Sequence, residues 1–180
     1  MKILVTGATG GVGSITVSIL GKLGYNVIAL SGKKEKIKFL KKIGANEVIS
    51  REEFMESAHK PLLSERFAGV VDTVGGDILV QAIKQTKYDG VVTCCGLTAS
   101  HELNLNVFPF ILRGVRLIGI DSVECRLEKK QAAWEKLASK WKIDTFSNLT
   151  NEITLNEIKE AYAQLLSGHA VGRYLVKIKD

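Results

Sequence analysis

The sequence predicts an α/β protein with a doubly wound, parallel six-stranded sheet. Short apolar runs rich in Val and Ile alternate with longer stretches of helical periodicity. A glycine cluster separates the first apolar run from the first helical stretch. The chain has 180 residues, of which 46% are apolar, enough to bury one good core. Since crossovers between parallel strands are right-handed, alternating strands and helices in this order leave few other topologies.

The strands and helices are expected in alternation along the chain. The expected strands of the sheet are 3–6, 26–30, 47–49, 67–73, 90–95 and 115–120. Helices are expected after the first glycines, before Gly44, from Gly76 to about Thr86, at 108–113, at 128–141 and at 156–166. A brief extended piece at 153–155 and a last alternating strand at 173–178 complete the pattern.

The first helix is expected to turn its larger apolar side chains towards the sheet. Val12, Ile15, Thr16, Ile19, Leu20 and Leu23 recur at helical spacing, whereas Ser14, Ser18 and Lys22 would face elsewhere.

The glycine cluster before this helix is typical of a phosphate-binding turn. Bare backbone lets a phosphate approach, and the N–H groups at the helix start meet it with the positive end of the dipole. The dinucleotide fingerprint requires three glycines, but this chain has Ala8, Gly10 and Gly13 at those places. A structural strand–helix turn without a ligand is the alternative interpretation.

The same letters also fit a second pattern, with Thr6, Gly7, Gly11 and Gly13 resembling the short-chain dehydrogenases. That family needs a catalytic Tyr followed four residues later by Lys. The tyrosines here are followed at that spacing by Ala29, Val92, Leu166 and Ile178, so the short-chain hypothesis lacks its proton donor.

The end of the second strand favours NADP(H) over NAD(H). An NAD site has an acidic residue about 20 residues beyond the glycines, but this chain has Ser31, Gly32, Lys33 and Lys34 there. A hydroxyl and ammonium groups suit a 2′-phosphate, which an acid would repel. The alternative is that these lysines only solvate a helix. Arg51, after the third strand, is expected either at the rim of an adenine pocket or simply on the surface.

Net charge, apolar run length, cysteine count and histidine spacing limit the classes of protein that this sequence can represent. The net charge of +6 and the pI near 9.2 invite a nucleic-acid interpretation, but the lysines are spread over several helices without interleaved aromatic residues. No apolar run has the length of a membrane helix, so we expect a soluble, cytoplasmic protein. Three cysteines, two of them adjacent, do not suggest a disulfide framework. His59, His101 and His169 lack metal-ligand spacing, so no metal site is expected.

Several longer segments resemble one known family. These are VTGATGGVGSITVSILGKLGYNVIALSGK, KKIGANEVISREEF, VVDTVGGD, CCGL, PFILRGVRLIGIDSV and GRYLVKI. Together they resemble the nucleotide-binding half of the medium-chain dehydrogenase/reductases, and most of all the zinc-independent branch with YhdH- and YhfP-like quinone oxidoreductases and acryloyl-CoA reductases. The resemblance covers nearly the whole chain and implies a Rossmann domain. It also implies NADPH-dependent hydride transfer to an activated carbon–carbon double bond.

The resemblance assigns roles to particular residues. It implies that Thr9, Gly10, Gly11 and Val12 contact the pyrophosphate; Ser31, Gly32 and Lys33 the 2′-phosphate; Arg51 the adenine side; and Leu97, Phe110 and Ile111 the nicotinamide half. It further implies a homodimer formed through the sixth strand, from Leu117 to Asp121.

The resemblance also divides the chain into an NADP(H)-binding domain, 1–150, and a return segment, 151–180, that packs on a catalytic domain in full-length relatives. Family members begin with that barrel-like catalytic domain, whereas this sequence starts at the first cofactor-binding strand. We therefore expect cofactor binding with little or no turnover, and no catalytic residue in this chain. A nucleotide-sensing or partner-binding module and an atypical short-chain reductase are the alternatives.

Overall fold

A computed structural model describes residues 1–56, 60–144 and 146–178, so His59 lies outside the described residues. Six parallel strands form the main sheet in the order β3-β2-β1-β4-β5-β6. The strands are β1 Lys2–Val5, β2 Asn26–Ser31, β3 Glu47–Ser50, β4 Phe67–Asp72, β5 Thr86–Cys94 and β6 Arg116–Gly119. The prediction of a doubly wound, six-stranded α/β sheet is thus confirmed.

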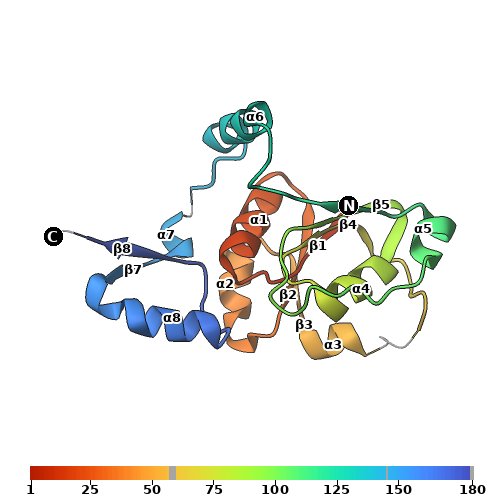
Figure 1. The fold of residues 1–180 in the computed structure, drawn as a ribbon, viewed down its shortest axis with the longest axis horizontal. Helices are drawn as coiled ribbons and strands as arrows, with labels where there is room; N and C mark the ends of the chain where they lie inside the picture. Colours follow the sequence, from red (N-terminus) through yellow and green to blue (C-terminus); the bar gives the residue numbers. More distant parts are fainter. Residues whose placement is uncertain (57–59, 145, 179–180) are drawn as a thin grey trace.

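Helices cover both faces of the sheet (Figure 1). They are α1 Gly11–Lys22, α2 Ile37–Lys42 after a 3₁₀ turn, α3 Arg51–Met55, α4 Gly76–Lys84 and α5 Phe108–Arg113. The short helix α3 was not predicted from the sequence; Ser50 starts it, because its side-chain oxygen accepts a hydrogen bond from the Glu53 amide at 3.1 Å.

Two apolar clusters form the core, one on each face of the sheet. Successive residues of β2 alternate between them: Ile28 and Leu30 pack with α3 and α4, whereas Val27 and Ala29 pack with α1 and α2. Since successive side chains of a strand point to opposite faces, burial on both faces explains why these strands read as continuous apolar runs.

The orientation predicted for α1 is right for Ile15, Ile19 and Leu20, which pack against the core, and wrong for Val12, Leu23 and the two serines. Its buried residues are Gly13, Ser14, Val17 and Ser18, whereas Val12 and Leu23 are 48% and 41% exposed. The reason is distance at two points: a Cβ added at Gly21 would lie 2.7 Å from the Gly44 carbonyl oxygen, and one at Gly13 would lie 2.3 Å from the Gly7 carbonyl oxygen, so larger residues do not fit there. The inner face of α1 therefore combines small residues with Val17, and part of the apolar pattern is exposed.

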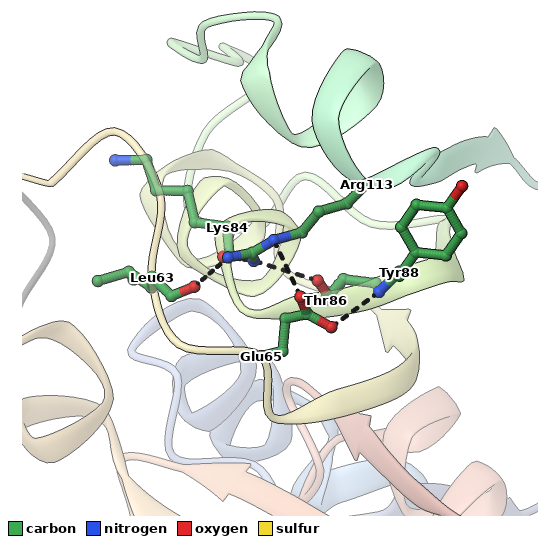
Figure 2. A network of polar contacts seen from close by, with 6 residues as sticks. All are labelled: Leu63, Glu65, Lys84, Thr86, Tyr88 and Arg113. Atoms are coloured by element: carbon green, nitrogen blue, oxygen red, sulfur yellow. Dashed lines mark hydrogen bonds and ion pairs between the residues drawn. The ribbon is translucent and has the colours of Figure 1, made fainter.

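Helix α5 is held by an arginine that reaches three neighbouring carbonyls (Figure 2). Arg113 donates to the carbonyl oxygens of Leu63 at 2.6 Å, Lys84 at 2.9 Å and Thr86 at 3.4 Å. Its Nε lies 3.5 Å from a carboxylate oxygen of Glu65, whose other oxygen accepts a hydrogen bond from the Tyr88 amide at 3.0 Å. This network ties α5 to the end of α4 and the start of β5.

Beyond β6 the chain leaves the main sheet (Figure 1). Helix α6, Leu127–Ala138, buries none of its residues. The side chain of Trp134 on this helix is 70% exposed. Helix α7, Phe146–Leu149, leads into a separate two-stranded parallel sheet of β7, Thr150–Thr154, and β8, Arg173–Lys177, connected by α8, Ile158–Leu166.

Candidate dinucleotide-binding site

The glycine-rich loop lies at the carboxyl end of β1, between its neighbours β2 and β4. Gly7 adopts a left-handed conformation, φ +56°, and its carbonyl accepts a hydrogen bond from the Gly10 amide at 2.9 Å. Gly7 therefore makes the tight turn that the fingerprint would place at Ala8, which is fully buried. A Cβ at Gly13 would lie 2.3 Å from the Gly7 carbonyl oxygen, so Gly13 is the close helix–strand contact.

The first turn of α1 follows this loop directly. Gly10 is the N-cap and has no side chain to occupy the amides of the first turn, which have no acceptor within the helix. The first turn also contains no acidic residue. Of the predicted pyrophosphate ligands, Val12 is about half exposed, whereas the side chain of Thr9 is buried. The exposed amide end of α1 suits an anion.

The tip of β2 gathers a hydroxyl and two cationic side chains. The buried Ser31 hydroxyl oxygen accepts a hydrogen bond from the Lys33 amide at 3.0 Å. A Cβ added at Gly32 would lie 3.6 Å from Cζ of Arg51, so the guanidinium lies beside this glycine. Burial lowers the pKa of the Lys33 ammonium; Glu35 opposes this, while Lys36 and Arg51 add to it. The structure therefore brings together Ser31, Gly32, Lys33 and Arg51.

Residues 169–173 connect the tip of β2 to the glycine-rich loop. The Lys33 ammonium donates a hydrogen bond to the Ala170 carbonyl oxygen, and the Gly172 amide donates one to the Thr9 carbonyl oxygen at 2.8 Å. Because residues two apart are separated by at most about 7 Å, these two contacts lie close together at the carboxyl ends of β1 and β2. The two candidate phosphate sites therefore belong to one surface.

Sequence reasoning missed Arg173 as part of this surface. A Cβ added at Gly11 would lie 3.2 Å from Cγ and 3.3 Å from Cζ of Arg173, so this guanidinium extends over the start of α1. The letters around Arg173 predict only an alternating strand, and it lies 162 positions beyond Gly11 in the sequence. No sequence signal pointed to this contact.

Asp72 organises the opposite side of the loop. Its carboxylate is fully buried and accepts hydrogen bonds from the Thr6 hydroxyl at 2.6 Å and the Gly75 amide at 2.8 Å. The Thr73 hydroxyl donates to the Thr6 carbonyl oxygen at 2.9 Å. A Cβ at Gly96 would lie 2.1 Å from the Thr73 carbonyl oxygen. These contacts bring the carboxyl ends of β1, β4 and β5 close together.

The three residues predicted for the nicotinamide half occupy different environments. Leu97 is 68% exposed and lines a cavity of about 330 Å³ with Cys94, Ser100 and Leu117. Phe110 packs against the apolar cluster that includes α4, and Ile111 is 70% exposed on α5. The structure places Leu97 next to Gly75, at the ends of the strands.

The fold and the loop define a class: a Rossmann-type α/β domain with a glycine-rich loop at the switch point between β1 and β4. Residues 11–140 match the model of the zinc-binding dehydrogenase family. The chain belongs to this family, which confirms the resemblance to the medium-chain dehydrogenase/reductases.

Two curated relatives match almost the whole chain. The putative quinone oxidoreductase YhfP of Bacillus subtilis is 44% identical over 178 residues, covering 98% of this chain and 54% of that protein. The probable acrylyl-CoA reductase AcuI of Escherichia coli is 41% identical over 177 residues, with coverages of 98% and 54%. The chain therefore spans about half the length of these relatives.

Solved structures share this fold. The YhdH oxidoreductase from Salmonella enterica, crystallised with NADP, superposes with a TM-score of 0.93 at 42% identity, covering 99% of this chain and 54% of that one. Bacillus subtilis YhfP, crystallised with NAD, superposes with a TM-score of 0.92 at 43% identity, covering 98% and 54%. Relatives of similar identity have thus been crystallised with either dinucleotide.

The family name refers to zinc, but the described residues do not offer a site for it. Among them no group of three or more His, Cys, Asp or Glu side chains could hold a metal ion. The Asp72 carboxylate, near Cys94 and Cys95, is already hydrogen-bonded to Thr6 and Gly75. Burial and Asp72 raise the pKa of both thiols, which disfavours the thiolates that bind zinc.

In the described part of the chain no helix has the length and apolarity needed to span a membrane.

Proposed function

We propose that this chain is the NADP(H)-binding half of an oxidoreductase that reduces activated carbon–carbon double bonds, in enoyl thioesters or quinone-like acceptors. One observation carries the proposal: the cationic tip of β2 and the amide end of α1 lie on one surface, joined by residues 169–173. A 2′-phosphate and a pyrophosphate are the two anionic groups that such a surface suits. The NADP bound to the YhdH oxidoreductase of Salmonella enterica supports this choice.

The proposed contacts follow the geometry of the surface. Residues 9–12 receive the pyrophosphate at the start of α1, and the Arg173 guanidinium supplies a second positive charge above Gly11. Ser31, Gly32 and Lys33 hold the 2′-phosphate, and Arg51 stacks on the adenine side. Leu97, Phe110 and Ile111 face the nicotinamide half.

The chemistry that we propose needs a second wall. A bound nicotinamide supplies the hydride, and this chain's residues bind and orient the dinucleotide. Reduction also requires the acceptor at near-attack distance and water excluded. In our proposal the other half of the protein provides that wall, and residues 151–180 return to it. The exposed apolar side chains of β8 and α8, among them Leu175 at 54% and Leu166 at 87%, support such a contact. We therefore expect little or no turnover from this chain alone.

We further propose a homodimer through β6 and the residues that follow it, from Leu117 to Asp121. β6 is an edge strand of the main sheet, and an edge presents unpaired N–H and C=O groups. Ile118 and Ile120 on it are 45% and 51% exposed, and Trp134 on the neighbouring α6 is 70% exposed. Sedimentation of the wild type and an Ile118→Lys variant tests the dimer, which the substitution should dissociate.

Calorimetric titration with NADPH and NADH tests the cofactor assignment. We expect NADPH to bind more tightly, and Lys33→Met to reduce that preference by about 10-fold or more, the worth of one charge-assisted hydrogen bond. Lys38→Met is the matched control, because Lys38 is exposed on α2. Tighter binding of NADH, or binding of neither dinucleotide, would refute the proposal.

The expected inactivity is a separate question. NADPH oxidation with acryloyl-CoA and with simple quinones tests it. The 180-residue chain is used at concentrations above its measured Kd for NADPH. Robust turnover would contradict the need for a second wall and leave the cofactor assignment standing.

A further inference from the structure

Residues 169–173, which lead from α8 into the first residue of β8, contact both parts of the candidate cofactor surface. The Ala170 carbonyl oxygen accepts a hydrogen bond from the Lys33 ammonium, at the tip of β2. Two residues later, the Gly172 amide donates to the Thr9 carbonyl oxygen at 2.8 Å, in the glycine-rich loop. These five residues follow the nucleotide-binding elements by more than 50 positions, and the glycine pattern and the basic tip of β2 do not include them.

We infer that residues 169–173 determine cofactor specificity, because the Ala170 carbonyl positions the Lys33 ammonium for a 2′-phosphate. The inference rests on the proposed function, since it takes Lys33 as the 2′-phosphate ligand. Ala170 acts here as a positioning residue through its backbone oxygen. Discrimination between the phosphorylated and unphosphorylated dinucleotides therefore depends on residues 169–173 and not on β2 alone.

The physical reason lies in the chemistry of lysine. An ammonium has three donors on a flexible four-carbon stem, and ordering that stem is costly in entropy. One donor used on Ala170 holds the stem before a ligand arrives and leaves two donors for phosphate oxygens. The dipole of the Ala170 carbonyl also favours the charged form of Lys33. Burial and the nearby Lys36 and Arg51 act in the opposite direction, because they lower the pKa of this ammonium. An ordered, charged lysine is the state that recognises a phosphate.

The position of the segment depends on a glycine. Gly172 has φ +65°, and a Cβ added to it would lie 2.2 Å from the Leu149 carbonyl oxygen. A side chain there would push the segment away from both Thr9 and Lys33. The Asn151 side-chain amide adds a second restraint, because it donates to the Val171 carbonyl oxygen at 2.8 Å.

Gly172→Ala is therefore the perturbation, and Gly168→Ala is its matched control. Gly168 also has a positive φ, +72°, but a Cβ there would meet nothing within 4 Å, so the substitution adds similar backbone strain without the collision. The measurement is the ratio of the dissociation constants for NADH and NADPH. We use the ratio because weaker binding at the pyrophosphate affects both dinucleotides and cancels.

We expect Gly172→Ala to reduce the NADPH preference by about 5-fold or more, as expected for losing a charge-assisted contact. Gly168→Ala should leave the ratio unchanged. In a Lys33→Met background, Gly172→Ala should not change the ratio further, because the lysine through which the segment acts is gone. A purely structural role of the segment would weaken both dinucleotides equally and leave the ratio intact.

The outcomes separate the two proposals. If the wild type shows no NADPH preference, the proposed function fails, and this inference fails with it. If Lys33→Met abolishes the preference but folded Gly172→Ala retains it, the proposed function stands and the specificity role of the segment is overturned. A ratio that still responds to Gly172→Ala in the Lys33→Met background overturns the role of the Ala170 contact.

A measurement on the unaltered chain covers the case in which Gly172→Ala does not fold. Hydrogen exchange of peptides within 167–173 is compared at saturating NADPH and saturating NADH. We expect NADPH to give the greater protection, because the 2′-phosphate immobilises Lys33 and, through it, Ala170. Equal protection by the two dinucleotides overturns the inference.

Discussion

Replacing Arg113 with Ala tests how α5 is held against α4 and β5. The substitution removes two well-formed hydrogen bonds, to Leu63 at 2.6 Å and Lys84 at 2.9 Å. At ~1.5 kcal/mol each for a charged donor, these contribute about 3 kcal/mol. The bond to Thr86, at 3.4 Å, is too long to add much. The ion pair with Glu65, whose side chain is 42% exposed, is worth at most ~0.5 kcal/mol after screening.

Equilibrium unfolding in urea measures this loss. With an m-value of ~2 kcal/mol/M, the midpoint of Arg113→Ala should fall by about 1.5 M. Glu65→Gln is the control, because it removes the ion pair while an amide oxygen can still accept from Tyr88, and it should cost under about 0.5 kcal/mol. The reasoning is refuted if Arg113→Ala costs less than about 1 kcal/mol, or if the two variants are equally destabilised, since the ion pair would then be the main interaction.

Three further predictions concern packing and ionisation. Gly13→Ala places a Cβ 2.3 Å from the Gly7 carbonyl oxygen and should lower the free energy of unfolding, measured thermally, by about 3 kcal/mol. Gly24→Ala is the control, because Gly24 has φ +79° and open space around it, and it should cost about 1–2 kcal/mol. The reverse order would contradict the contact assigned to Gly13. Cys95 is exposed but has a raised pKa, so with the other two cysteines changed to Ser it should react with a disulfide reagent at pH 8 more slowly than free cysteine, and unfolding in urea should remove the difference. The NADPH preference should be complete at neutral pH and fall as pH rises through the pKa of Lys33, which lies below 10.5; a decline centred at or above 10.5 would exclude the desolvated ammonium as its source.

Local sequence patterns were sufficient for the order of the strands in the main sheet along the chain and for the location of the loop. Strands buried on both faces appear as continuous apolar runs, so β1 to β4 were found within a few residues. β5 begins at Thr86, four residues before the predicted start, because its pairing with β4 shifts register between Phe67 and Gly69. A register irregularity depends on the partner strand and leaves little trace in a single sequence.

The inner face of α1 could not be read from hydrophobicity. The pattern that places Val12 and Leu23 inside assumes that a helix buries its largest apolar side chains. Here the helix lies so close to the loop and to Gly44 that side chains are excluded at Gly13 and Gly21, while Ser14 is buried on the same helix. The required spacing is a property of the packed domain.

The sequence by itself determined the individual strands, the glycine-rich turn and the basic tip of β2, because each depends on residues close together in the chain. Only the tertiary structure decided that Ala170, Gly172 and Arg173 lie against Lys33, Thr9 and Gly11. These contacts join residues more than 130 positions apart. They form because the chain, after completing the main sheet, folds back across the carboxyl ends of β1 and β2. Hydrophobic periodicity and residue spacing along the chain do not predict this change of direction.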